Sequence, residues 1–323
     1  MTVKCIFRKE DEYTVMIIGI LLEVVLPIFI LIGAGVLMQR AFQLDLYTLA
    51  KINFYYITPA VVFMSMYESE MSAELFGTIV LYYSIYVTAL YLIGRLCSAR
   101  LKFTRGMRAA FTNALILDNS GNYGLPVNEL AFKGDALAGS LQALIMTMQA
   151  LLTFTYGVFS IQGAKTQGLY RQALIGFLKL PVPYALVAGL VFQIGSIPLP
   201  EFLARPLIYA DQSLVAIALL TLGAQMIKYP LRLHRKEIYF SVAIRLLAAP
   251  VIGILIVLSL GLKGIPAQAL ILASGMPVGV NASILAEEYQ NEPDFTAQTV
   301  LFSTLLSVLT LTALIPLSRI LAA

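Results

Sequence analysis

Two polar stretches interrupt hydrophobic segments that are otherwise long enough to cross a membrane. Residues 118–126 read Asp-Asn-Ser-Gly-Asn-Tyr-Gly-Leu-Pro, and residues 274–281 read Ser-Gly-Met-Pro-Val-Gly-Val-Asn. In lipid, an unwound backbone is tolerated only where it is buried in protein or lines a water-filled cavity. The half-helix that follows such a break begins with free N–H groups and a partial positive charge. The two stretches therefore predict a binding site for an anion.

The small and polar residues of these stretches are the candidates for contact with a bound substrate. They are Asn119, Gly121, Asn122, Gly124 and Pro126 in the first stretch, and Gly275, Pro277 and Asn281 in the second. The asparagines could bind substrate or satisfy freed backbone groups, and the glycines allow close approach of the backbone. The prolines suit the first turn of a new helix, where a missing N–H costs little. The alternative is that these residues only stabilise kinks.

Three further polar residues lie in or beside predicted membrane segments. Asp118 borders the first stretch and is the candidate for taking up and releasing a proton, with a capping or pairing role as the alternative. Arg245 could pair with a carboxylate substrate or with Asp118, or its long side chain could extend to the membrane surface. Gln225 could contact substrate or bridge two helices.

The composition is that of a membrane protein and argues against several kinds of site. The chain is 59% hydrophobic and 12% charged, with a mean hydropathy of +0.84, whereas soluble domains are about 25% charged. Cys5 and Cys97 form neither a disulfide framework nor a CxxC motif. His234 is the single histidine, so we expect no metal site and no cofactor. The net charge of +4 lies mainly in loops and does not indicate a nucleic-acid partner.

The apolar runs predict about ten membrane-spanning helices, at roughly 20 residues for each crossing. The predicted spans cover residues 18–38, 46–66, 75–97, 107–132, 136–161, 181–195, 207–227, 238–260, 266–287 and 296–317. The polar stretches fall in the fourth and ninth spans, which divides the chain into five plus five. Pro126 and Pro277 are 277 − 126 = 151 positions apart, and Pro27 and Pro181 are 181 − 27 = 154 apart. These similar offsets indicate an inverted repeat with two broken helices that cross.

This division predicts four parts of the chain. They are an N-terminal tail over residues 1–15, a first five-helix repeat over 16–161, a cytoplasmic connection over 162–180 and a second five-helix repeat over 181–323. Lysines and arginines concentrate in alternate loops, which the positive-inside rule assigns to the cytoplasm. We therefore expect a multi-pass protein of the cell (inner) membrane with both termini on the non-cytoplasmic side.

Several motifs resemble those of the auxin efflux carrier family of membrane transporters. In chain order they are Leu26-Pro27, Pro59-Ala60, residues 119–126, Leu222-Gly223-Ala224-Gln225, residues 245–250 and Pro277 followed by residues 286–289. The resemblance spans nearly the whole chain, and the asparagine-rich first stretch is its specific part. It implies a ten-helix fold similar to that of bile-acid/sodium symporters, and transport of organic anions such as malate, malonate or auxin-like acids. The long cytoplasmic loop of many plant members is absent, which favours a compact carrier of the prokaryotic type.

The expected function is secondary transport of a small organic anion by alternating access, driven by a proton gradient or the membrane potential. No P-loop for ATP is present in the sequence. A sodium-coupled symporter is the alternative within this class. A passive channel and a membrane-embedded enzyme are the alternatives of other classes, and no HExxH, GxSxG or Cys/His cluster favours an enzyme. The expected partners are the organic anion and membrane lipid, with a homodimer left open.

Overall fold

The protein is helical over the part of the chain that the computed structural model describes, which is residues 15–162, 175, 178–227 and 235–322. The predicted tail over residues 1–15 lies outside these residues except for its last position, as does most of the predicted connection over residues 162–180. Within the described ranges, the β-type pairing consists of one isolated antiparallel bridge between Asp118 and Val278. The prediction of an all-α membrane protein is confirmed.

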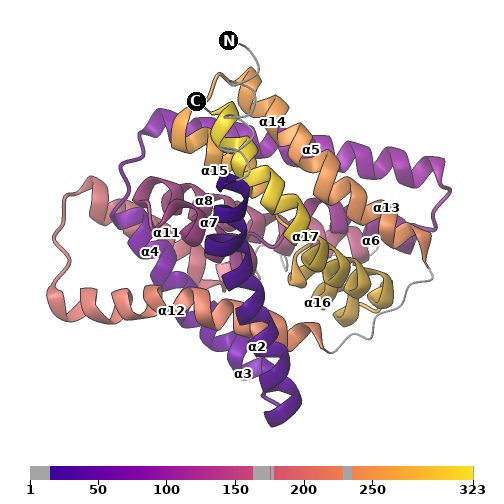
Figure 1. Cartoon of the computed structure of the whole chain (residues 1–323), viewed down its shortest axis with the longest axis horizontal. Coiled ribbons are helices and arrows are strands. Elements are labelled where there is room, and N and C mark those ends of the chain that lie inside the picture. Colours follow the sequence, from indigo (N-terminus) through magenta and orange to yellow (C-terminus); the bar gives the residue numbers. More distant parts are fainter. Residues whose placement is uncertain (1–14, 163–174, 176–177, 228–234, 323) are drawn as a thin grey trace.

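The helical elements are π-helical turns, labelled η, and α-helices (Figure 1). In chain order they are η1 (Leu21–Val25), α2 (Leu26–Phe42), α3 (Leu46–Ile52), η2 (Asn53–Ile57), α4 (Thr58–Tyr67), α5 (Ala73–Arg100), α6 (Arg105–Ile116), η3 (Ser120–Gly124), α7 (Leu125–Phe132), α8 (Ala136–Leu152), η4 (Thr153–Gly157), α9 (Val158–Gln162), α11 (Pro181–Ile194), α12 (Glu201–Met226), α13 (Lys236–Ala243), η5 (Ile244–Ala248), α14 (Ala249–Ser259), α15 (Gly264–Ser274), α16 (Val280–Glu288) and α17 (Pro293–Leu321).

Six continuous helical segments of the described chain are long and apolar enough to cross a membrane. They are Val15–Phe42, Ala73–Arg100, Ala136–Ile161, Glu201–Met226, Lys236–Ser259 and Pro293–Leu321. Each overlaps one of the ten predicted spans. The other four predicted spans are shorter or interrupted: α3, η2 and α4 form one, α11 another, and α6–α7 and α15–α16 are the broken pair. The count of ten crossings and the inverted repeat therefore remain predictions.

Prolines explain most of the π-helical turns. The described residues contain five such turns, and four of them end two residues before a proline: Pro27, Pro59, Pro126 and Pro250. Proline has no N–H to donate to the carbonyl four residues earlier, and its ring clashes with that carbonyl. A wider turn moves the carbonyl away, as at Leu26, whose N–H donates five residues back to Leu21. The helices therefore continue through these prolines.

Helix packing divides the described elements into two groups. In the first group α2, α3 and α4 pack with α11 and α12, and in the second group α5–α9 and α13–α17 pack around the two broken helices. Figure 1 shows α2 crossing α12 on one side of the molecule, with α5, α13 and α14 toward the other. The groups meet where α4 contacts α8 and α12 contacts α7.

Two glycines bring α2 and α12 into backbone contact within the first group. A β-carbon on Gly35 would overlap the carbonyl oxygen of Leu220, and one on Gly223 would overlap that of Ile32. Without a water-driven hydrophobic force between helices in lipid, such small residues let the backbones gain close van der Waals contact. This contact makes the α2–α12 pair a rigid part of the first group.

Candidate functional site

The two broken helices meet at a short backbone crossing. In the first, α6 ends at Ile116 and η3 begins at Ser120, and in the second, α15 ends at Ser274 and α16 begins at Val280. The intervening residues 117–119 and 275–279 run antiparallel at this point. The sequence prediction of two interruptions at these positions agrees with the helix boundaries.

Backbone hydrogen bonds join the two unwound segments. The N–H of Asn119 donates to the carbonyl of Pro277 (2.9 Å), and the N–H of Gly279 donates to the carbonyl of Leu117 (2.8 Å). A β-carbon at Gly279 would lie 2.5 Å from the carbonyl oxygen of Asp118, so this crossing requires glycine there. Each segment thus satisfies polar groups that the other leaves open by unwinding.

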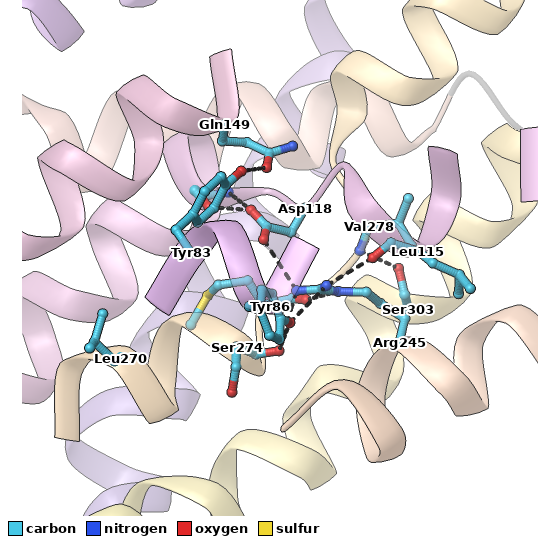
Figure 2. A network of polar contacts seen from close by, with 12 residues as sticks. Tyr83, Tyr86, Leu115, Asp118, Gln149, Arg245, Leu270, Ser274, Val278 and Ser303 are labelled. Atoms are coloured by element: carbon cyan, nitrogen blue, oxygen red, sulfur yellow. Dashed lines mark hydrogen bonds and ion pairs between the residues drawn. The ribbon is translucent and has the colours of Figure 1, made fainter. Parts of the chain in front are cut away.

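Arg245 lies at the centre of the crossing and is fully buried (Figure 2). It is carried by η5, the π-helical turn before Pro250. Its guanidinium donates to the carbonyl oxygens of Leu115, Ser274 and Met276 (3.0, 3.3 and 2.8 Å), to the Tyr86 hydroxyl (3.1 Å) and to the Asp118 carboxylate (3.3 Å). Leu115 and Ser274 belong to the last turns of α6 and α15, where carbonyls lack helical partners and carry partial negative charge. Arg245 therefore neutralises two helix C-termini at once.

Asp118 completes the ion pair within the crossing. One carboxylate oxygen accepts from Arg245, and the other accepts from the backbone N–H and the hydroxyl of Ser120. The pairing of Arg245 with Asp118, one of the alternatives raised by the sequence, is present in the structure, whereas an Arg245 side chain reaching the membrane surface is not. Both charges are thereby engaged with protein groups in this conformation.

Three buried tyrosines of α5 support the crossing from one side. The hydroxyl of Tyr86 donates to the Ser274 carbonyl and accepts from Arg245. The hydroxyl of Tyr82 donates to the Leu270 carbonyl of α15, and that of Tyr83 hydrogen bonds with the Gln149 side-chain amide of α8. Figure 2 shows Tyr83 and Tyr86 flanking the Asp118–Arg245 pair. These tyrosines therefore hold polar groups of the crossing in addition to packing.

A cavity of about 50 Å³ lies beside the crossing. From the first group of helices it is lined by Phe54 and Thr58; from the second group by Asp118, Asn119, Gly121, Asn122, Met146, Gln149, Ala150, Gly279, Val280 and Asn281. The N-terminal ends of η3 and α16 both reach this cavity. The side chains of their N-cap positions, Asn119 and Gly279, make no capping hydrogen bond, while the Asp118 carboxylate accepts from the first N–H of η3. Two helix starts at one cavity contribute partial positive charge there.

The three predicted asparagines all line this cavity. Asn119 is buried, and its side-chain nitrogen has no hydrogen-bond partner. The side-chain oxygen of Asn122 accepts from the Asn53 amide (2.9 Å), and Asn281 is exposed. Gly121 also lines the cavity, and a β-carbon there would approach Met146 no closer than 3.7 Å. An amide donor that is buried without a partner beside a cavity is available for a ligand.

The other predicted site residues lie outside the lining of this cavity. Gly124 and Gly275 pack closely: a β-carbon at Gly124 would lie 2.5 Å from the Gln142 amide, and one at Gly275 would overlap Leu314. Pro126 is buried in α7, one π-helical turn beyond the break, and Pro277 lies in the unwound segment before α16. The prediction that Pro277 opens a helix is therefore wrong, because α16 begins only at Val280.

Gln225 also lies away from the 50 Å³ cavity beside the crossing, which we call the crossover cavity. It lines a separate pocket of about 10 Å³, together with residues of α16 and α17. Its side-chain oxygen is buried and has no hydrogen-bond partner. The pocket is too small for an organic anion in this conformation, so the structure does not bring Gln225 together with the asparagines.

Sequence reasoning missed several residues of the cavity. Gln149 is the informative one, because it is an amide in the middle of an apolar helix that contacts Tyr83 and lines the cavity beside Asp118. A buried amide within a membrane span is a usable signal for a functional or bridging role. Phe54, Thr58 and Met146 carry no such signal, since apolar residues and threonine are common in any membrane helix.

Comparisons with known proteins identify the family. The family described as "Membrane transport protein" matches residues 20–315. An uncharacterized transporter of Methanothermobacter thermautotrophicus is 24% identical over 299 residues, which cover 90% of this chain and 95% of the relative.

Two further relatives match over shorter regions. Auxin efflux carrier component 1 of Arabidopsis thaliana is 22% identical over 137 residues, 41% of this chain and 22% of the plant protein. A protein of Rhizobium meliloti named for malonate transport is 32% identical over 126 residues, 38% of each chain. The family match over most of the sequence, the helical membrane fold and the crossing agree with one another. The chain belongs to the auxin efflux carrier family of membrane transport proteins, and it is a transporter and not an enzyme.

Proposed function

We propose that the chain carries a small organic anion across the cell membrane and binds it at the crossover cavity. The observation that carries this proposal is the convergence of two helix N-termini and three asparagines on one cavity. The one carboxylate that lines it, Asp118, is paired with Arg245. Backbone N–H groups and amide nitrogens are donors, and donors at a positive helix terminus suit a carboxylate.

The proposed substrate is a carboxylate of the malate, malonate or auxin-like class. The names of the two partly matching relatives favour this class. The cavity of about 50 Å³ holds about one or two water molecules, so a dicarboxylate enters only when the surrounding helices move apart. This conformation is therefore the closed one in the proposed cycle.

Alternating access would arise from movement of the two helix groups against each other. The crossover cavity lies between Thr58 of the first group and the crossing of the second. A second cavity of about 230 Å³ also lies between the groups, lined by α4 and α12 on one side and by α7 and α8 on the other. Because α7 follows η3 along the chain, we assign the second cavity to the path by which substrate reaches the same site from the other side of the membrane.

In this proposal ten helices cross the membrane as two inverted repeats, with both termini on the non-cytoplasmic side. The driving force is a proton gradient or the membrane potential, with Asp118 as the coupling group when its ion pair with Arg245 opens. Sodium coupling is the competing mechanism. In the described chain no group of three His, Cys, Asp or Glu side chains converges, so sodium would need carbonyl and amide oxygens as ligands.

Uptake into proteoliposomes tests the proposal. Labelled malonate, malate and indole-acetate would be supplied with an inward proton gradient, with an inward sodium gradient, or with neither. We expect saturable uptake that falls at least tenfold in Asn122→Ala and in Asn281→Ala, because each removes an amide from the cavity. Gln193→Ala, an amide of α11 outside the cavity, serves as the matched control.

Each outcome distinguishes the alternatives. Stimulation by unlabelled substrate on the opposite side indicates a carrier, since an open channel shows none. Uptake that depends on sodium alone would replace the proton mechanism. Equal uptake by wild type and by both asparagine variants would remove the site assignment, and no uptake of any of the three acids by folded protein would remove the substrate class.

A further inference from the structure

A third cavity carries a positive charge that the transport proposal does not use. It has a volume of about 440 Å³ and lies among α5, α6, η4 and α9, all in the second group of helices. Its polar lining comes from Arg95, Arg105, Arg108, Thr112, Tyr156 and Ser160. None of the elements that line it belongs to the first group, so this cavity is separate from the contact between the two groups.

The three arginines of this cavity lack acidic partners among the described residues. None of the salt bridges there involves Arg95, Arg105 or Arg108. Residues 163–177, which follow α9 along the chain, contain no Asp or Glu in the sequence. Guanidinium groups close together repel one another, so a cavity with three of them favours an anion.

Buried polar atoms show that the cavity is more than a group of solvated surface charges. The hydroxyl of Thr112 is buried without a hydrogen-bond partner, and Thr112 is only 1% exposed. The Nε of Arg108 is likewise buried and unpartnered. A buried polar group without a partner is unfavourable, and both Arg108 and Thr112 line the cavity. The Arg108 guanidinium is available to a bound group, and a change of the Thr112 rotamer would bring its hydroxyl, which now lies against Gly94 of α5, to the same group.

The chemistry of the donors favours a phosphate group. Guanidinium groups bind phosphate oxygens through paired, charge-assisted hydrogen bonds, and hydroxyls of Thr, Ser and Tyr add neutral ones. Arg95 lies five residues before the end of α5, which is about 7–8 Å along a helix. It is flanked by Leu92 and Leu96, each 59% exposed. Arg95 therefore lies at the depth of lipid headgroups if α5 crosses the membrane.

We propose that this cavity, formed by Arg95, Arg105, Arg108 and Thr112, binds a phosphate group, supplied by an anionic lipid or by a soluble phosphate. The site is independent of the crossover cavity and goes beyond the proposed transport function. Bound phosphate would neutralise the mutual repulsion between Arg95 of α5 and Arg105 and Arg108 of α6, and so hold the ends of these two helices together beside η4 and α9.

Titration of the purified full-length protein in detergent, followed by native mass spectrometry, tests this site. The probes are dioctanoyl phosphatidylglycerol, its zwitterionic phosphatidylcholine counterpart, and pyrophosphate. We expect the triple variant Arg95→Gln/Arg105→Gln/Arg108→Gln to bind the preferred anion at least tenfold more weakly. Arg100→Gln removes one charge from the end of α5 outside the cavity, as Arg95→Gln does inside it, and it should bind like wild type. If the triple variant does not fold, Arg95→Gln alone, an exposed side chain, replaces it.

The probes distinguish the source of the phosphate. Phosphatidylglycerol binding that the triple variant loses supports a lipid site. Pyrophosphate binding that the triple variant loses supports a soluble ligand. Thr112→Val keeps every charge and should weaken binding several-fold, because it removes the buried hydroxyl. Equal binding by wild type, the triple variant and Thr112→Val, or no binding of any anionic probe, would overturn the proposal.

Discussion

Arg245 is the side chain on which the geometry of the crossing depends most directly. It is fully buried and gives hydrogen bonds to three backbone carbonyls, a tyrosine hydroxyl and a carboxylate. Both broken helices supply partners to this charge, so Arg245 links one helix to the other. Removal of the guanidinium would leave the Asp118 carboxylate without its charged partner in a buried position, and would remove a donor from the C-terminal carbonyls of both α6 and α15.

We therefore expect Arg245→Met to destabilise the protein by about 3–5 kcal/mol. Thermal unfolding in detergent measures the change. The double variant Arg245→Met/Asp118→Leu should recover part of the loss, since it removes the unpaired charge. Arg205→Met is the control: its salt bridge with Glu201 is exposed, and such pairs contribute about 0–1 kcal/mol. An unfolding temperature of Arg245→Met equal to that of wild type would contradict the structural role.

At the level of residues, the sequence predicted which residue types form the site better than it predicted which individual residues line the cavity. The asparagines of both stretches line the cavity, because each lies in an unwound segment or in the first turn of the half-helix that follows it. Gly124 and Gly275 do not line it, since whether a glycine faces a ligand or a neighbouring helix depends on packing that a single sequence does not reveal. Gln149 was missed although an amide within an apolar span is a signal; what the sequence does not reveal is its partner Tyr83, which lies 66 positions away.

At the level of elements, the contact between α2 and α12 predicts that two glycines of α2, Gly33 and Gly35, differ in how they tolerate alanine. Gly35 touches the backbone of α12, whereas a β-carbon at Gly33 would have nothing within 4 Å. Gly35→Ala should separate the helices and destabilise the protein by about 1–3 kcal/mol. Gly33→Ala should be neutral or stabilise by up to about 1 kcal/mol, because alanine favours helix.

Paired thermal unfolding curves of the two variants measure this difference. The two changes add the same methyl group to the same helix, so propensity cancels in the comparison. Similar unfolding temperatures for Gly35→Ala and Gly33→Ala would mean that α2 and α12 are not in backbone contact.

The positions of the helices follow from the sequence, but the π-helical turns within them were not predicted. Long apolar runs predicted the helices because roughly 20 apolar residues are needed for one crossing. The π-helical turns before Pro27, Pro59, Pro126 and Pro250 were not predicted, although the missing proline N–H provides the signal. Pro277 shows why the signal is ambiguous: this proline lies in an unwound segment, where glycines on both sides permit the chain to leave the helix.

At the level of the whole molecule, the proposed alternating-access cycle requires the two groups of helices to move relative to each other. The groups contact each other where a β-carbon at Gly139 of α8 would lie 3.5 Å from the Ser65 hydroxyl of α4. Cysteines at these two positions would bring their sulfur atoms within reach of each other, so the pair is suited to an engineered disulfide. In a background with Cys5→Ala and Cys97→Ala, oxidation of Ser65→Cys/Gly139→Cys should abolish uptake, and a reducing agent should restore it.

Uptake by the two single-cysteine variants under the same oxidation is the control. Both should retain transport, because neither can link the groups. Undiminished uptake by the fully cross-linked double variant would show that these surfaces do not separate during the cycle.

The backbone pairing at the crossing also constrains how the protein is made. The N–H of Asn119 finds its partner only at Pro277, which the ribosome adds 277 − 119 = 158 residues later. At 5–20 residues per second, synthesis of that interval takes about 8–30 seconds. During this time the first break lies in or beside the membrane with its polar backbone unpaired. The nascent first half must therefore be held by water, by the insertion machinery or by a temporary partner until the second half arrives.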